Sequence, residues 1–149
     1  MKQVIQSTRT GKLDVKEVPA PKAAAKEILV RTSTSLISAG TESMVVNFAK
    51  KSLVAKAKAR PDLVQKVMTK ARNDGFSATL KATMSRLDEP LPLGYSAAGT
   101  VVEVGTGLEG AFRVGDRVAI AGAGIANHAE INVVPRNLAA PIPEGVSDE

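Results

Sequence analysis

Residues 93–105 read LGYSAAGTVVEVG, and residues 112–118 read FRVGDRV. In the first run, threonine and valines follow small residues and the run ends on a glycine, as is typical of a β-strand that enters a turn. The second run carries a Gly-Asp turn, after which a further strand is predicted over residues 116–120. The two runs together predict a β-hairpin.

Short strands are also predicted toward both ends of the chain. Apolar and polar residues alternate through residues 1–43, with a hairpin turn at 10–12, and no helix of useful length is expected before Ser43. Strand signals recur at 130–134, and residues 138–142 could form a closing strand. Several short strands with glycine-rich turns favour a mainly β fold, a partly open β-barrel.

A helical insertion interrupts these strands over about residues 44–88, within bounds of 43–90. Pro61 suits the first turn of its second helix, and Asn73-Asp74-Gly75 supplies a stop. Three apolar stripes at helical spacing are expected to pack inward. Their members are Met44, Val45, Phe48 and Ala49, then Leu63, Val64, Val67, Met68 and Ala71, then Phe76, Leu80, Met84 and Leu87.

The composition limits the class of protein. A chain of 149 residues with 44% hydrophobic residues is long enough for one domain with a core. Neither a secretory signal nor an apolar run long enough to cross a bilayer is present in the sequence, so we expect a cytoplasmic protein. Because there is no cysteine and only one histidine, His128, a metal site is not expected.

The net charge of +5 comes from one segment. Between Met44 and Leu87 there are ten basic residues and two acidic ones. Binding to nucleic acid through this face is one interpretation, but the segment lacks the interleaved aromatic residues of single-strand binders. The pattern favours a solvated helical surface, and we do not expect nucleic acid as the partner.

Two glycine clusters could suggest a cofactor loop. Residues 105–110, GTGLEG, match the dinucleotide fingerprint, but residues 111–116 are too few and too broken by glycine to form the helix that the fingerprint requires. We therefore interpret GTGLEG as a hairpin turn. The second cluster, residues 122–124, could let the backbone approach a ligand or could simply need positive backbone angles.

The barrel residues resemble a known family. The run from Gly94 to Val118, the residues 127–130 and the tail of residues 134–147 are similar to the GroES-like N-terminal domain of medium-chain dehydrogenases/reductases, the superfamily of zinc-type alcohol dehydrogenases. Residues 15–21 resemble the strand that, in those enzymes, precedes the one that aligns with residues 28–30. The resemblance covers everything except the helical insertion.

A narrower resemblance includes the insertion. Residues 36–42, LISAGTE, followed by a basic helical segment and by residues 92–96, resemble a subgroup in which such a dehydrogenase is fused to an oxidoreductase module of the Gfo/Idh/MocA type. This resemblance leaves open whether such a module is present after the barrel.

The resemblance implies a function and a missing part. It implies hydride transfer between NAD or NADP and a small molecule, which would be a carbonyl, an alcohol or an activated alkene. In the family a nucleotide-binding Rossmann domain follows the barrel and binds most of the cofactor, so we expect it downstream of residue 149. The fragment alone is then expected to be inactive.

The family's zinc ligands are replaced here. A zinc-binding cysteine aligns with Ser38, and a histidine-glutamate pair aligns with Tyr95 and Ser96. Hydroxyl groups are poor zinc ligands near neutral pH, and the four cysteines of the structural zinc lobe are absent as well. The resemblance therefore implies an enzyme that works without zinc.

Five residues are candidates for the site. Tyr95 could donate a proton in place of the metal, or could be a tyrosine at the edge of the core whose hydroxyl caps the backbone. His128 and Glu42 are further catalytic candidates, although a lone histidine is more often structural. Ser38 and Thr41 are candidates for binding the cofactor, but a threonine before a helix also suits a cap, which is the role we favour for Thr41.

Two other classes of protein remain open. A non-catalytic, co-chaperonin-like binding module shares the barrel, and the insertion could instead be a nucleic-acid-binding surface. The insertion could also cover the substrate cleft, bind an acidic partner or dock on the downstream domain. A homo-oligomer is also open.

Overall fold

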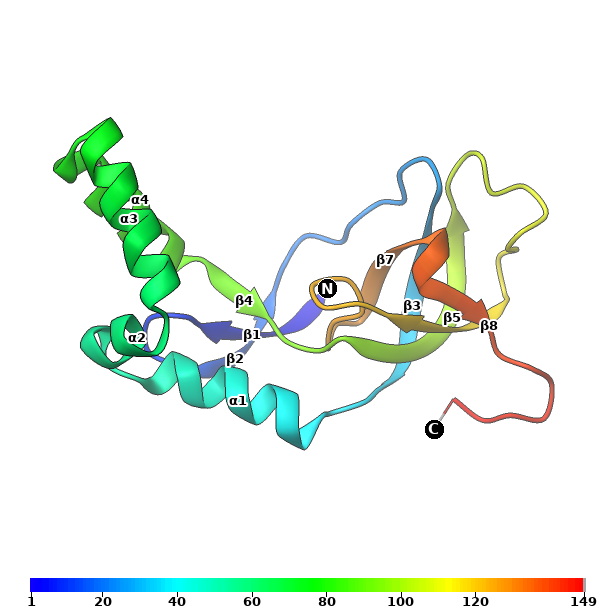
Figure 1. The fold of residues 1–149 in the computed structure, drawn as a ribbon. Helices are drawn as coiled ribbons and strands as arrows, with labels where there is room; N and C mark the ends of the chain where they lie inside the picture. Colours follow the sequence, from blue (N-terminus) through cyan, green and yellow to red (C-terminus); the bar gives the residue numbers. More distant parts are fainter. Residues whose placement is uncertain (149) are drawn as a thin grey trace. The chain divides into compact units, whose positions relative to one another are not determined.

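The computed structural model describes residues 1–148, apart from the side chains of residues 53 and 86–88 (Figure 1). These residues group into two compact units. The first contains Met1–Ile5, Asp14–Glu42 and Pro92 onward, and the second contains Gln6–Leu13 and Ser43–Leu91.

A curled antiparallel sheet forms most of the first unit. Its five strands lie in the order β7-β3-β5-β6-β8. Register shifts between Leu29 and Val30 and between Thr32 and Thr34 bend β3 against β5, which helps the sheet to curl. The bounds are β3 (Glu27–Ser35), β5 (Ser96–Val104), β6 (Arg117–Ala121), β7 (Ile131–Pro135) and β8 (Ala139–Pro141), with a 3-10 turn at Arg136–Leu138 before β8.

One face of this sheet carries the core. Its most buried side chains are branched aliphatic residues that alternate along the strands, because successive residues of a strand point to opposite faces. Leu108 and Phe112, from the turn between β5 and β6, close over them. The strand members are Ile28, Val30, Val101, Val118, Ile120 and Val134.

The connection between β5 and β6 contains no helix within residues 105–116. Gly105 N donates to Glu27 O, and Lys26 N donates to Thr106 O, so the backbone of this turn is tied to the start of β3. The interpretation of GTGLEG as a turn is therefore confirmed, as is the closing strand, β8.

A second, three-stranded sheet has the order β2-β1-β4. Its strands are β1 (Lys2–Ser7), β2 (Leu13–Glu17) and the short β4 (Pro90–Pro92). Ser7 and Lys12 pair across the predicted turn through the bond from Ser7 N to Lys12 O. The tight approach of Gly11 to Lys50 would not admit a side chain, since a Cβ on Gly11 would lie 2.6 Å from Lys50 Cγ.

The predicted insertion is helical, with four helices: α1 (Ala39–Lys50), α2 (Leu53–Ala59), α3 (Pro61–Asp74) and α4 (Phe76–Asp88). Pro61 begins α3 and Gly75, at φ +87°, ends it, as predicted. The expectation that no helix begins before Ser43 is wrong, because the hydroxyl of Ser38 caps a helix at Ala39.

The apolar stripes of α3 and α4 are less buried than expected. No residue of α3 is buried, and Phe76 and Leu80 of α4 are 75% and 45% exposed. Thr79, one residue before Leu80, is buried instead. The side chain of Leu87, the last member of the third stripe, lies outside the described residues. Within residues 1–148, no helix has the length and apolar character needed to cross a membrane.

The expected architecture, strands of a partly open barrel interrupted by a helical insertion, is confirmed.

Candidate proton-relay site

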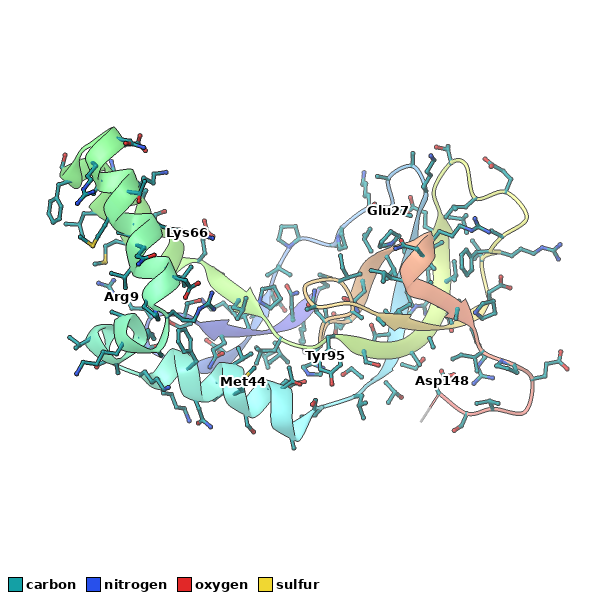
Figure 2. The ribbon with its side chains drawn as sticks, in the orientation of Figure 1. Arg9, Glu27, Met44, Lys66, Tyr95 and Asp148 are labelled. Atoms are coloured by element: carbon teal, nitrogen blue, oxygen red, sulfur yellow. The ribbon has the colours of Figure 1, made fainter. Side chains whose placement is uncertain are left out.

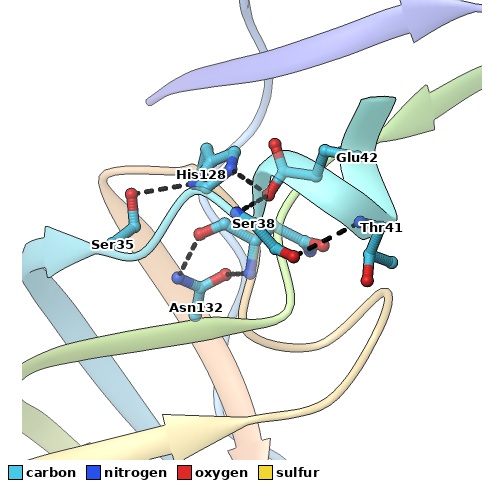
Figure 3. A network of polar contacts seen from close by, with 7 residues as sticks. Ser35, Ser38, Thr41, Glu42, His128 and Asn132 are labelled. Atoms are coloured by element: carbon cyan, nitrogen blue, oxygen red, sulfur yellow. Dashed lines mark hydrogen bonds and ion pairs between the residues drawn. The ribbon is translucent and has the colours of Figure 1, made fainter. Parts of the chain in front are cut away.

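Three polar side chains form a hydrogen-bonded chain in the first unit (Figure 3). His128 lies on the loop between β6 and β7, Ser35 ends β3, and Glu42 lies in the first turn of α1. His128 Nδ1 is 2.8 Å from Ser35 Oγ, and His128 Nε2 is 3.1 Å from Glu42 Oε1. Two of the predicted catalytic residues, His128 and Glu42, are thus in direct contact.

The pair is largely shielded from water. The side chains of His128 and Glu42 are 10% and 13% exposed. An ionised carboxylate only accepts hydrogen bonds, so His128 Nε2 carries the hydrogen toward Glu42. In the neutral ring, Nδ1 then accepts from the Ser35 hydroxyl. This order of donors allows a proton to pass between Ser35 and the ring.

Ser38 positions Glu42 by capping α1. Ser38 Oγ accepts from Thr41 N at 3.3 Å, and Glu42 Oε1 accepts from Ser38 N at 3.3 Å. These reciprocal bonds resemble a capping box and satisfy amides that the helix itself leaves open. The favoured role of Thr41 as the cap is therefore wrong: Thr41 is the third residue of α1 and Ser38 is the cap. The Thr41 side chain is exposed.

Asn132 holds the loop that carries His128. Its side chain is 3% exposed, accepts from Asn127 N at 3.0 Å and donates to Asn127 O at 3.1 Å and Thr32 Oγ1 at 3.0 Å. Sequence reasoning missed this residue. A signal was present, because Asn132 stands two residues before Val134 on the inward face of β7, where an amide needs partners.

Gly94 lets the loop that carries His128 lie close to the segment between β4 and β5. Its φ is +100°, and a Cβ there would lie 2.6 Å from His128 N. His128 N donates to Leu93 O at 2.7 Å, and Val4 N donates to His128 O at 2.9 Å. The backbone of His128 is therefore fixed from two sides.

Tyr95 is not a member of this network. It immediately precedes β5 (Figure 2) and is partly buried. Its backbone oxygen accepts from Gly122 N at 2.8 Å. Its hydroxyl makes no hydrogen bond to any residue within 1–148. The suggestion that this hydroxyl caps a backbone group is therefore wrong, and its role as a donor stays a prediction.

A pocket of about 380 Å³ borders the chain of polar side chains. Ser35 and His128 both line it, so a bound molecule can reach the outer end of the chain. Its remaining wall consists of Lys2, Gln3, Val4, Val15, Thr32, Ser33, Ala129 and Glu130.

The available donors do not fit a catalytic zinc ion. The oxygen of Ser38 is used as a helix cap, and both ring nitrogens of His128 are occupied by Ser35 and Glu42. Among the side chains that the structure describes, no group of three or more histidine, cysteine, aspartate or glutamate residues could hold a metal. Tyr95 and Ser96 supply only hydroxyls, which bind zinc poorly.

The sequence identifies the family to which this barrel belongs. Residues 65–144, more than half of the chain, match the alcohol dehydrogenase GroES-like domain family. The chain belongs to this family, so the predicted GroES-like domain of the alcohol dehydrogenase type is confirmed. No curated protein sequence matches the chain. The narrower subgroup stays a prediction.

Solved structures share the fold. The chain is similar to Escherichia coli quinone oxidoreductase complexed with NADPH (TM-score 0.65, 17% identity, 100% of this chain and 35% of that chain). An alcohol dehydrogenase superfamily protein from Novosphingobium aromaticivorans (0.63, 21%, 99% and 36%) and a mycobacterial protein complexed with NADPH (0.61, 21%, 99% and 35%) are also similar. The chain thus spans about a third of the length of these proteins.

Proposed function

We propose that this chain is the substrate-side domain of a zinc-independent, NAD(P)-linked oxidoreductase that transfers hydride to or from a carbonyl, an alcohol or an activated alkene. Membership of the GroES-like family supports the class of reaction. The hydrogen-bonded chain Ser35–His128–Glu42 is the observation that carries the proposal, since it supplies a path for the proton that accompanies the hydride.

The nicotinamide cofactor would supply or accept the hydride when bound, mostly through a downstream domain. On this chain, two hydroxyl groups at the start of α1 are available to hydrogen-bond to such a cofactor. The Thr41 hydroxyl is exposed and without a hydrogen bond to residues 1–148, and Ser38 keeps its own hydroxyl hydrogen for donation. We propose Ser38 and Thr41 as donors to cofactor oxygens.

The proton moves along the chain of side chains. When a substrate hydroxyl is oxidised, Ser35 Oγ accepts its proton and passes its own to His128 Nδ1. The imidazolium that forms is stabilised by the Glu42 carboxylate at Nε2. In the reductive direction the same protons move in the opposite order, and the new substrate hydroxyl receives one from Ser35.

Tyr95 is a second candidate donor. Its hydroxyl has no hydrogen-bond partner among residues 1–148, and it stands where zinc-dependent relatives are expected to carry a metal ligand. A phenol can donate to the negative charge that develops on a carbonyl oxygen.

The test is NADH or NADPH oxidation by the full-length protein with a quinone, an enone and a ketone, with and without a zinc chelator. We expect turnover that the chelator does not change. His128→Asn and Glu42→Gln should lower kcat by roughly a hundredfold or more with a smaller change in KM, because a proton-transfer group contributes about 10²- to 10⁴-fold. Tyr95→Phe tests the second donor in the same assay.

Glu17→Gln is the matched control, because Glu17 is exposed and makes no side-chain bond to residues 1–148. Loss of activity with the chelator, restored by added zinc, would contradict the zinc-independent mechanism. Absence of turnover with all three substrates and both cofactors would overturn the proposed class of reaction.

A further inference from the structure

A second pocket, of about 840 Å³, opens at the end of the sheet where β3 begins. Glu27, the first residue of β3, marks this end (Figure 2). All residues that line the pocket belong to the first unit: the residue before β3, part of the connection between β5 and β6, and residues of the segment 135–141. Ser35, at the other end of β3, borders the pocket beside the proton-relay site, and the two pockets share no residue.

This second pocket combines an apolar wall with three polar side chains that have no partner. Leu108 and Phe112, both members of the core, belong to the apolar wall. Lys26, Arg136 and Asn137 also line the pocket and are exposed. Their side chains make no hydrogen bond or ion pair with any residue that the structure describes. A largely apolar pocket of this size with a few free polar groups is typical of a small-molecule site.

The two cations of the wall stand opposite each other at the end of β3 and β7. The register of these strands pairs Glu27 with Pro135, so the next pair outward is Lys26 with Arg136. Consistent with this pairing, Arg136 N donates to Lys26 O at 3.3 Å. Like charges directly opposite each other destabilise a pair of strands. The fold therefore holds two positive charges together at the pocket, where an anion would neutralise both.

The carboxylates next to this pocket in the sequence are used elsewhere. Glu27 Oε2 accepts from Ala24 N at 3.1 Å, and Glu109 Oε1 accepts from Gly107 N at 3.0 Å. Neither glutamate lines the pocket. Among the residues that the structure describes, no carboxylate is therefore in place to neutralise the two cations.

The backbone of Lys26 is held in an unfavourable conformation. Its φ is +64°, and within residues 1–148 it is the only residue other than glycine with a positive φ. Lys26 N donates to Thr106 O at 2.8 Å, which fixes this conformation. A Cβ on Gly107 would lie 3.6 Å from Lys26 Cγ, so the lysine stem lies along the turn that lines the pocket. Such strained residues cluster at ligand-binding sites.

We propose that this pocket binds a small-molecule phosphomonoester, with its phosphate on Lys26 and Arg136 and its aromatic or aliphatic body against the apolar wall. A phosphomonoester carries about −1.5 to −2 charges at pH 7, which matches two cations, whereas a carboxylate neutralises only one. The planar guanidinium of Arg136 fits two phosphate oxygens, and Asn137 can donate a further hydrogen bond. This site is independent of the proposed oxidoreductase activity.

The test is calorimetric titration of the full-length protein with 1-naphthyl phosphate, with 1-naphthoate and 1-naphthol as analogues of lower charge. We expect saturable binding of the phosphate, weaker binding of the carboxylate and the weakest binding of the naphthol. Lys26→Gln and Arg136→Gln should each weaken binding of the phosphate by about ten- to a hundredfold, as expected for hydrogen bonds to a charged group. Both should leave binding of the naphthol unchanged.

Lys22→Gln and Arg113→Gln are the matched controls. Each removes one positive charge from an exposed residue of the same unit that does not line the pocket. Both variants should bind 1-naphthyl phosphate like the wild type.

Thermal denaturation without ligand separates binding from a purely structural role. Because Lys26 and Arg136 repel each other, Lys26→Gln and Arg136→Gln should unfold at the same temperature as the wild type or at a higher one. Arg136→Glu should unfold at a higher temperature, since the new carboxylate would face Lys26, and it should abolish binding of the phosphate by repulsion.

Several results would overturn the proposal. One is absent binding of 1-naphthyl phosphate, and another is binding that Lys26→Gln and Arg136→Gln leave unchanged, as for a phosphate site elsewhere in the full-length protein. Equal losses of affinity in the two controls would show an effect of net charge only. Binding of 1-naphthoate as tight as that of the phosphate would contradict recognition of the second charge.

Discussion

Gly99 lies where β5 pairs with β3, opposite Thr32. A Cβ at this position would lie 2.1 Å from Arg31 O and 2.9 Å from Val30 Cγ1, so backbone as well as side chain would have to move. Gly99→Ala should therefore lower the free energy of unfolding by about 3 kcal/mol, at the upper end of overpacking costs. Urea denaturation followed by circular dichroism measures this.

Gly40→Ala is the control for the same change of residue. Gly40 lies in the first turn of α1, and a Cβ there meets nothing within 4 Å. Alanine is favoured over glycine in helices by up to about 1 kcal/mol, so this variant should be as stable as the wild type or more stable. Equal stability of the two variants would contradict the close approach of β5 to β3.

Some residues of the site could be proposed from the sequence, but not their pairing. His128 is the only histidine, which made it a candidate, and Glu42 lies beside a predicted cap. Their contact joins residues 86 positions apart, and the periodicity of apolar residues carries no information about such a contact. Ser35 was not predicted either, because a serine at the end of a strand is common and nothing in the sequence shows that it contacts His128.

The loop between β6 and β7 is the element that places His128, and Asn132 holds it. Asn132→Leu should lower the free energy of unfolding by about 1–3 kcal/mol, because Asn127 N and the Thr32 hydroxyl lose a buried partner. Asn137→Leu, an exposed asparagine without a side-chain bond to residues 1–148, should cost less than about 0.5 kcal/mol. Thermal denaturation of both variants makes the comparison.

If Asn132→Leu were as stable as Asn137→Leu, the amide network would not be what holds this loop.

The strands were easier to predict than the helices. Buried residues alternate with more exposed ones along β6 and β7, and glycine or proline stands at their ends, so the existence of these strands follows from the pattern. The start of α1 was misplaced because Ser38-Ala39-Gly40 has little apolar content, and only the cap reveals the helix. The exposure of α3 could not be predicted, since periodicity gives the direction of an apolar face but not what covers it.

Across the whole molecule, the two units differ in how completely they bury the apolar residues of their sequence patterns. In the first, aliphatic side chains meet across one curled sheet and bury themselves almost completely. In the second, the apolar stripe of α3 lines an open pocket, and its members Leu63, Val67 and Met68 stay 43%, 39% and 55% exposed. The barrel could be predicted from its sequence pattern because the apolar residues of that pattern are the ones that become buried. The insertion instead keeps apolar surface exposed, which only a ligand or partner would bury.

The pH dependence of stability should reveal how the C-terminal segment is held. Arg117 Nε donates to Asp148 Oδ1 at 2.9 Å and Ser33 Oγ donates to Asp148 Oδ2 at 2.8 Å, joining this segment to β6 and β3. The Arg117 and Ser33 bonds hold the pKa of Asp148 below its ordinary value of 3.8. A lowered pKa in the folded state means that this carboxylate stabilises the protein above pH 3.8 and loses that effect as the pH falls through the folded-state value.

Asp148→Asn should therefore be less stable than the wild type at neutral pH, and the difference should shrink as the pH is lowered below 3.8. Urea denaturation at a series of pH values measures the free energy of unfolding of both proteins and therefore the difference between them at each pH. Asp14→Asn is the control, because Asp14 is exposed and has no side-chain partner among residues 1–148, and it should match the wild type throughout. A difference between Asp148→Asn and the wild type that is constant with pH would show that the carboxylate's charge does not hold this segment.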